Sequence, residues 1–215
     1  MTSKVTILDY GMCNLLNVAR AFQVLGADVL VTDDAATAAA AERLVVPGVG
    51  AFKDSVDEVQ GRGFDQVIRD YVATGRPFLG ICVGMQMLFD ASEEFGEHRG
   101  LGLLPGRVRG VPALTTEGAP QRVPHIGWNH LVVPEARRSW EGTFLDNCVD
   151  ESPSVYFVHS FAAVPELESD RLADCIYGGH RLCAAVQRDN LMAVQFHPER
   201  SARQGLGMLQ GFMQL

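Results

Sequence analysis

The stretch RPFLGICVGMQMLF, residues 76–89, decides how this chain folds. It opens with a short apolar run typical of a strand buried on both faces, which ends at Cys82, and continues with apolar residues at helical spacing. Gly80 and Gly84 stand two residues before and two residues after Cys82 and tolerate the unusual dihedrals of a sharp reversal. The pattern predicts a buried strand ending at Cys82 and a helix over 83–92.

Similar strand and helix patterns alternate through the first half of the chain. Runs typical of strands occur at 4–10, 27–34, 43–50 and 76–82. Helical patterns cover 14–26, 35–44 and about 52–74, the last of them interrupted near 61–63. Strands regularly separated by helices indicate an α/β fold with a doubly wound, mostly parallel sheet.

From about residue 100 onward the pattern changes to short β-type runs punctuated by Pro, Gly and Asn. This pattern predicts an additional antiparallel portion, followed by a C-terminal helix within 204–214. No internal repeat or low-complexity linker divides the sequence, and 215 residues is a normal length for one α/β domain. We therefore expect a single domain over 1–215.

Composition excludes several classes of protein. The net charge is −8 with scattered basic residues, so nucleic acid is not an expected partner. No segment has the roughly 18 uninterrupted apolar residues of a membrane span, and the N-terminus lacks a signal-peptide pattern, so we expect a cytoplasmic location. The five cysteines are widely spaced without a C-x-x-C pair, so neither disulfides nor a metal site is expected.

The G-x-C-x-G pattern around Cys82 is that of a nucleophile elbow. A thiol at this turn would lie at the N-terminus of the following helix, where unpaired N–H groups and the helix dipole favour the thiolate. The alternative is that Cys82 is a small buried residue of the sheet, since free cysteines are often buried. The elbow by itself leaves both interpretations open.

A second motif, VQFHPERS at 194–201, contains His197 and Glu199 on either side of a proline. Proline favours an extended backbone, so a spacing of two directs both side chains to one side. Glu199 could then orient the imidazole of His197 while the other ring nitrogen faces a nucleophile. The alternative is an ordinary His at a strand end with a neighbouring surface Glu. The five other histidines lack a carboxylate at this spacing on an extended segment.

The third motif is VVPGVGAF at 45–52, in which a strand ends in Pro-Gly-Val-Gly. Such a turn can direct backbone N–H groups into a crevice, as oxyanion stabilisation requires, although an ordinary glycine turn before a helix has the same pattern. Each of the three motifs is expected at the carboxyl end of a strand, where sites of doubly wound sheets lie. Together they predict a Cys-His-Glu amide hydrolase.

At this level of detail the chain resembles a known family. GICVGMQ at 80–86 and QFHPE at 195–199 are similar to the triad-type (class I) glutamine amidotransferases, which hydrolyse glutamine to glutamate and ammonia. DYGMCNL at 9–15, GLGLLPGRV at 100–108 and VPHIGWNHL at 123–131 are similar to the glutaminase subunit of imidazole glycerol phosphate synthase, in histidine biosynthesis. The resemblance covers nearly the whole chain.

The resemblance implies a flavodoxin-like sheet, no cofactor, and a role for each of several residues. Cys82 would be the nucleophile, His197 the general acid and base, and Glu199 its orienting partner. The oxyanion donors would be backbone N–H groups of Val49 or Gly50 and of Val83. The residues expected to hold L-glutamine are Gln86, Glu94 and the backbone segment His159, Ser160 and Phe161.

The resemblance also implies a separate subunit that consumes the ammonia, namely a cyclase of (β/α)8-barrel type that forms a heterodimer with this chain. Trp128, Asn129 and Arg200 are the interface candidates; the alternative for Trp128 is a core aromatic residue. Two positions depart from the family pattern: Cys13 stands where Gly is common, and Arg200 stands where Lys is common. Arginine keeps the charge at that position but changes the geometry of any ion pair.

Three other functions remain as alternatives. A glutaminase serving another synthase would keep the triad but should lack DYGM, HIGWN and GLGLLPG as a set. A cysteine peptidase or γ-glutamyl hydrolase should act without a synthase partner. A non-catalytic module would be expected to lose one of Cys82, His197 and Glu199, and all three are present.

Overall fold

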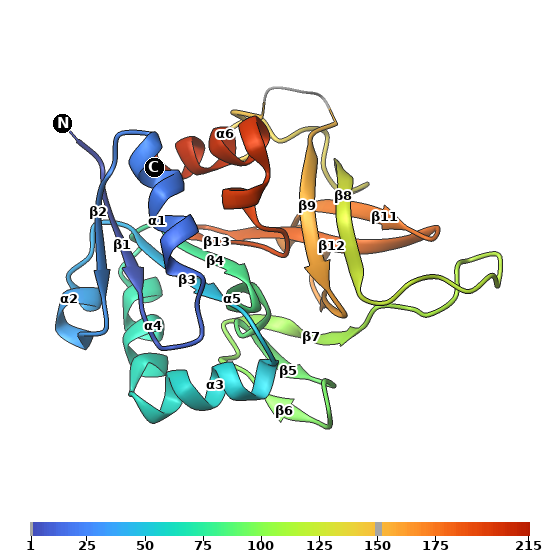
Figure 1. The fold of residues 1–215 in the computed structure, drawn as a ribbon, viewed down its shortest axis with the longest axis horizontal. Helices are drawn as coiled ribbons and strands as arrows, with labels where there is room; N and C mark the ends of the chain where they lie inside the picture. The colour runs from blue at the N-terminus through green and yellow to red at the C-terminus, as the bar shows by residue number, and fades with distance from the viewer. Residues whose placement is uncertain (1, 149–151) are drawn as a thin grey trace.

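The computed structural model describes residues 2–148 and 152–215, and most of their strands belong to one large mixed sheet (Figure 1). Within that part of the chain the strand order is β2-β1-β3-β4-β13-β12-β11-β8-β9. The strands of the first half of this order are β2 Asp28–Thr32, β1 Lys4–Leu8, β3 Leu44–Gly48, β4 Phe78–Cys82 and β13 Leu191–Val194. All four pairings among them are parallel, and β2-β1-β3-β4-β13 is the flavodoxin-like order.

Helices cover both faces of the parallel strands, as a doubly wound sheet requires (Figure 1). The helices are α1 Leu15–Val24, α2 Ala35–Ala39, α3 Phe52–Gly61, α4 Phe64–Ala73 and α6 Ala202–Met213. On one face α1 packs on α6, with the rings of Phe22 and Phe212 6.2 Å apart, and α2, α3 and α4 lie on the other face. The predicted break between two helices near 61–63 is confirmed, because α3 ends at Gly61 and α4 begins at Phe64.

The predicted antiparallel portion is present in two places, although the second also contains one parallel pair, β5 with β7. The large sheet continues through antiparallel pairings of β12 His180–Arg188, β11 Arg171–Tyr177, β8 His125–Val132 and β9 Ser154–His159. A second sheet has the order β10-β7-β5-β6, from β10 Phe161–Pro165, β7 Leu104–Gly110, β5 Phe89–Ser92 and β6 His98–Arg99. The sequence did not indicate that these strands would form two separate sheets.

The helix expected over 83–92 is wrong in its length. Helix α5 covers only Val83–Gln86, and strand β5 follows it at once. The carbonyl of Leu88 accepts backbone hydrogen bonds from the N–H groups of Leu103 and Leu104, so pairing with a distant segment replaces the next helical turn. A helix this short contributes little dipole, so the thiol at its start needs other support.

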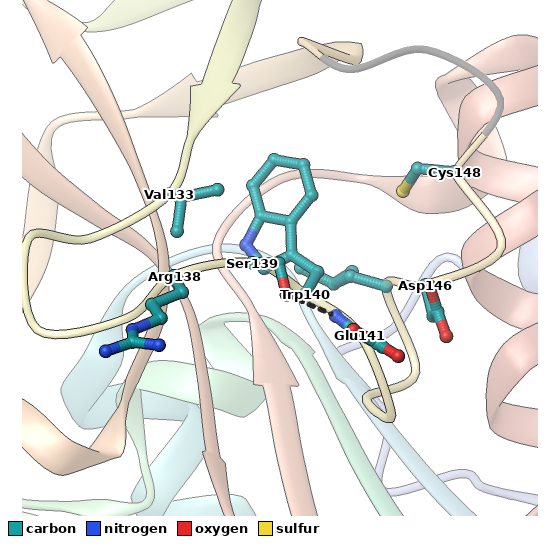
Figure 2. Close-up of a pocket in the computed structure, with 8 residues that line it drawn as sticks. Val133, Arg138, Ser139, Trp140, Glu141, Asp146 and Cys148 are labelled. Atoms are coloured by element: carbon teal, nitrogen blue, oxygen red, sulfur yellow. Dashed lines mark hydrogen bonds between the residues drawn. The ribbon is translucent and has the colours of Figure 1, made fainter.

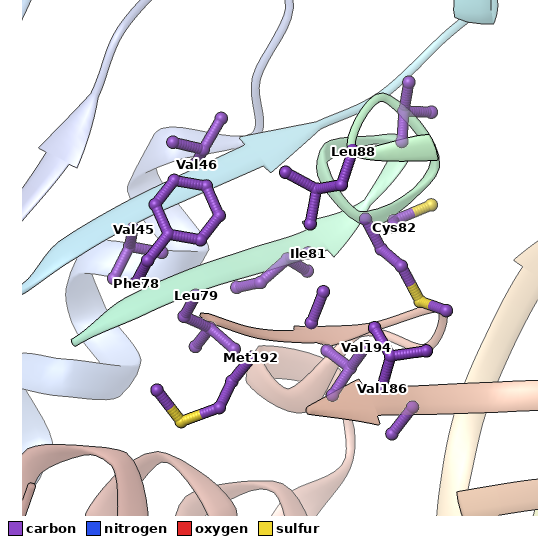
Figure 3. Packing of buried hydrophobic residues seen from close by; sticks show 14 of the residues in the cluster. Val45, Val46, Phe78, Leu79, Ile81, Cys82, Leu88, Val186, Met192 and Val194 are labelled. Carbon is purple, nitrogen blue, oxygen red and sulfur yellow. The ribbon is translucent and has the colours of Figure 1, made fainter. Parts of the chain in front are cut away.

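The core lies where the parallel strands pass between their helices. Figure 3 shows side chains of β3, β4 and β13 meeting there, including Val46, Ile81 and Val194. Cys82 stands at the edge of this cluster with 5% of its surface exposed. Gly48 of β3 lies beside Cys82 of β4, and His197 follows β13 by three residues. Packing of the sheet therefore brings the three sequence motifs to one edge.

Candidate active site

The turn at Cys82 has the strained geometry of an elbow. Its φ of 56° and ψ of −112° are unusual for a residue with a Cβ atom and cost of order 1–3 kcal/mol. The neighbouring glycines let the backbones approach: a Cβ atom on Gly80 would lie 2.8 Å from the Gly84 carbonyl oxygen, and one on Gly84 would lie 2.0 Å from that of Val46. The fold thus holds the thiol at a fixed point on the strand end.

His197 and Glu199 form the pair that the sequence predicts. The Nδ1 atom of His197 lies 2.8 Å from Oε1 of Glu199, and both side chains are buried. The imidazole of His197 also interacts with the Cys82 thiol, which affects its pKa. Cys82, His197 and Glu199 therefore lie in the order expected of a nucleophile, a base and an orienting carboxylate.

The imidazole of His197 is held in its charged form. Burial by itself would lower the pKa of His197, but hydrogen bonds to Cys82 and Glu199, and the negative charges there, raise it to about 10. An imidazolium beside a thiolate is a reactive pair, because the thiolate is the nucleophile and the imidazolium can protonate a leaving group.

This raised pKa predicts a titration that can be measured. In the free protein the His197 ring should lose its proton near pH 10, observed by the NMR shifts of its ring atoms. The stabilisation that the proton provides should be complete below about pH 6.5 and lost as pH rises through about 10. Glu199→Gln should lower the titration midpoint and exposed Glu117→Gln should not. A midpoint near 6.5 in the unmodified protein would contradict the geometry.

Gln195 is a polar residue of this site to which the sequence analysis gave no role. Its Nε2 atom donates to the Cys82 sulfur over 3.7 Å, and its Oε1 atom accepts from Gln86 Nε2 at 2.9 Å. The side chain is fully buried. Gln195 stands two residues before His197, so the same spacing rule that selected His197 and Glu199 could have identified it.

The backbone N–H of Val49, an expected oxyanion donor, is engaged elsewhere in this structure. It donates to the carbonyl oxygen of Met12 at 2.9 Å. Gly50 has a φ of +92° and, with Val83, lines the cleft beside Cys82. If Val49 supplies the donor, the peptide between residues 48 and 49 has to turn first. Oxyanion roles for Val49, Gly50 and Val83 therefore stay predictions.

The cleft at Cys82 brings together all the residues expected to bind substrate. A cavity of about 130 Å³ is lined by Gly50, Cys82, Val83, Gln86, Glu94, His159, Ser160 and Phe161. Glu94 enters from the segment after β5, and its Oε2 atom accepts from the N–H of Phe52, the first residue of α3, at 2.6 Å. The carboxylate therefore also fixes the segment that follows the Pro-Gly-Val-Gly turn.

Cavity volume alone would not identify the cleft at Cys82 as the candidate site. A roomier cavity of about 590 Å³ lies beside Trp140, Arg138 and Glu141, shown in Figure 2. The indole N–H of Trp140 donates to the carbonyl of Leu172, and none of the three motifs lines this cavity. The chemistry of the side chains, rather than volume, selects the cleft at Cys82.

The interface candidates lie away from the cleft, around strands β8 and β9. Trp128 is 55% exposed, which excludes the alternative that it is a core residue. The guanidinium of Arg200 lies 4.3 Å from the centre of the Tyr156 ring, and Trp128 meets the edge of the same ring. Tyr156, which the sequence analysis did not single out, is thus the residue that joins Trp128 to Arg200. Asn129 is described below with its hydrogen bonds.

Comparison with known families agrees with this geometry. A family model described as glutamine amidotransferase class-I matches residues 6–214. The chain belongs to this family.

Relatives of this amidotransferase span its whole length. The imidazole glycerol phosphate synthase subunit HisH 1 of Legionella pneumophila (strain Lens) is 46% identical over 99% of this chain and 100% of its own. The corresponding HisH subunit of Salinibacter ruber is 48% identical over 98% and 94%. PurLQS from Thermotoga maritima has a solved structure similar in fold, with a TM-score of 0.72 and 18% identity over 100% and 99% of the two chains.

Proposed function

We propose that this amidotransferase is the glutaminase subunit of an imidazole glycerol phosphate synthase. The observation that carries the chemistry is the buried set of Cys82, His197 and Glu199 at the cleft. The full-length relatives support the choice of synthase, since their names identify them as subunits of that enzyme. A single amidotransferase domain over 1–215 and a cytoplasmic location are part of the proposal, the former supported by the family match over 6–214. Among the described residues, no helix is long and apolar enough to cross a bilayer.

The reaction follows from the roles of the three residues. The Cys82 thiolate attacks the side-chain carboxamide carbon of glutamine, and the carbonyl oxygen becomes an oxyanion. His197 donates a proton to the departing nitrogen, which leaves as ammonia, and a glutamyl thioester remains on Cys82. His197 then takes a proton from water, which attacks the thioester and releases glutamate and the thiolate. Donors from Val49 or Gly50 and Val83 would lower the barrier by about 3 kcal/mol.

A turn of the Gly48–Val49 peptide would connect this chemistry to a partner. The Val49 N–H now donates to Met12, so the subunit alone would be slow, and the partner would favour the conformation that frees the donor. The proposed partner is a (β/α)8-barrel cyclase, which uses the ammonia to make imidazole glycerol phosphate and aminoimidazole carboxamide ribotide. The surface of this chain that would bind the cyclase contains Trp128, Asn129 and Arg200, and also Tyr156.

Glutamate release tests the proposed function, and cyclase binding tests the proposed docking surface. Glutamate release from glutamine should rise by at least about tenfold when the cyclase and its nucleotide substrate are added. Trp128→Ala should weaken binding of the cyclase by about 30-fold, as loss of a central aromatic anchor does. Leu30→Ala, an exposed apolar residue of the opposite edge strand β2, is the matched control and should bind normally. A free subunit as fast as the complex would refute the proposed coupling.

A further inference from the structure

Two buried histidines face each other beside the cleft. His125 of β8 and His159 of β9 are directly opposite in the antiparallel register, and Nδ1 of His125 lies 3.0 Å from Nε2 of His159. Burial lowers the pKa of both imidazoles to about 4, for His125 by burial alone and for His159 by burial as the main cause. Both rings are therefore neutral at physiological pH, and each has one donor and one acceptor nitrogen.

The ends of this pair fix the direction of its hydrogen bonds. The Phe161 carbonyl can only accept, so Nδ1 of His159, 2.9 Å away, carries a proton and donates to it. Nε2 of His159 must then accept from Nδ1 of His125. Nε2 of His125 in turn accepts from the Asn129 side-chain amide, whose Nδ2 lies 3.4 Å away. One tautomer of each ring satisfies the whole series.

The series continues from the Phe161 carbonyl to the nucleophile. The same oxygen accepts from Gln86 Nε2 at 2.9 Å, and Gln86 also donates to Gln195, whose own amide donates to the Cys82 sulfur. The position of Phe161 therefore affects two side chains of the cleft, one of which supports the thiol. His159 is the only link in this series between Phe161 and His125 among the described contacts.

Packing holds His125 firmly in this orientation. Its ring stacks between Phe157, 4.8 Å away, and Tyr177, 4.0 Å away, measured between ring centres. At the outer end, Asn129 Nδ2 also donates to the carbonyl of Ile176 at 2.9 Å. Asn129 follows exposed Trp128 in β8, so its side chain lies on the face of the sheet opposite to that of Trp128.

We propose that His125 is a positioning residue of the glutaminase site. It donates to Nε2 of His159 and so supports the ring whose Nδ1–H holds the Phe161 carbonyl that anchors Gln86. This inference rests on the proposed function for its kinetic consequence, while its structural part can be tested on the chain alone.

The test compares two substitutions that separate donation from packing. His125→Phe keeps an aromatic ring between Phe157 and Tyr177 but has no donor. His125→Asn loses the stack but places an amide N–H near the position of Nδ1. Partner-stimulated kcat should fall about tenfold in His125→Phe and recover most of that loss in His125→Asn. Should His125→Phe not fold, His125→Leu serves as the donor-free variant. His98→Phe, in β6, is the control and should be unchanged.

The ranking of the variants and the state of His159 decide the outcome. A purely structural role predicts that the phenylalanine variant is the better enzyme, which would overturn the proposal. Nitrogen NMR of the free chain should show His159 protonated at Nδ1, and the resonance of its unprotonated Nε2 should shift in the donor-free variant, which lacks the hydrogen bond from His125. An unchanged Nε2 resonance there would also overturn it. If the unmodified complex releases no glutamate, the proposed function fails, and the NMR result still tests His125.

Discussion

Cys82→Ser is expected to reduce glutamate release by at least about four orders of magnitude, even with the cyclase present. The structure surrounds this position with groups that suit a sulfur anion, namely the imidazolium of His197 and the amide of Gln195. A serine hydroxyl at the same strained turn keeps its proton and is a far weaker nucleophile. Glutamate release should be measured with saturating glutamine, together with binding of the cyclase, which should be normal.

A matched cysteine substitution separates the chemistry from any general effect on the fold. Cys148→Ser changes the same atom beside the Trp140 cavity, away from the cleft, and should retain full activity. Alkylation by iodoacetamide should inactivate the unmodified chain and Cys148→Ser alike. Near-normal glutamate release by Cys82→Ser would show that another group attacks the substrate, and the mechanism proposed above would be wrong.

Gly84→Ala is expected to lower the free energy of unfolding by about 3 kcal/mol or more. The new Cβ atom on α5 would lie 2.0 Å from the carbonyl oxygen of Val46 in β3, a backbone atom of the parallel sheet. No rotamer change can relieve this contact, so β3 and the start of α5 would have to separate. Chemical denaturation, followed by circular dichroism, measures the effect directly.

Gly61→Ala is the control for this substitution. Gly61 ends helix α3, and a Cβ atom there would meet nothing within 4 Å. Because alanine has the higher helix propensity, this variant should be as stable as the unmodified chain or slightly more stable. Equal stability of the two alanine variants would mean that the strand and the elbow can separate at little cost.

Local sequence patterns predicted the parallel half of the fold well. Runs such as 43–50 and 76–82 carry their own signal, because strands buried on both faces are apolar throughout. The helix expected over 83–92 failed for a physical reason that local patterns do not contain. Hydrogen bonds from residues 103 and 104 to Leu88, and pairing of residues 89–92 with the distant strand β7, end the helix and make the rest of the segment a turn and a strand.

In the candidate site, too, local sequence patterns predicted some contacts, and pairing between distant segments determined the others. His197 and Glu199 were predicted because a spacing of two on an extended segment is a local rule, and their hydrogen bond is present. The link between His125 and His159 joins residues 34 positions apart through the register of β8 and β9. No local pattern specifies that register. A role for His125, which has no carboxylate two residues away, could therefore be inferred only from the structure.

The two donors on the Phe161 carbonyl have a consequence for how the cleft can tell its substrate from a glutamine residue within a peptide. A carbonyl oxygen has two lone pairs, and His159 and Gln86 occupy both, while the neighbouring Ser160 carbonyl accepts from Val111. The Phe161 oxygen is thus not left for the α-ammonium of a free amino acid, whereas the Ser160 oxygen can accept one further hydrogen bond. Among the described residues that line the cleft, Glu94 is the only carboxylate. We therefore expect discrimination against a blocked amino terminus to depend on the Glu94 carboxylate and the Ser160 carbonyl.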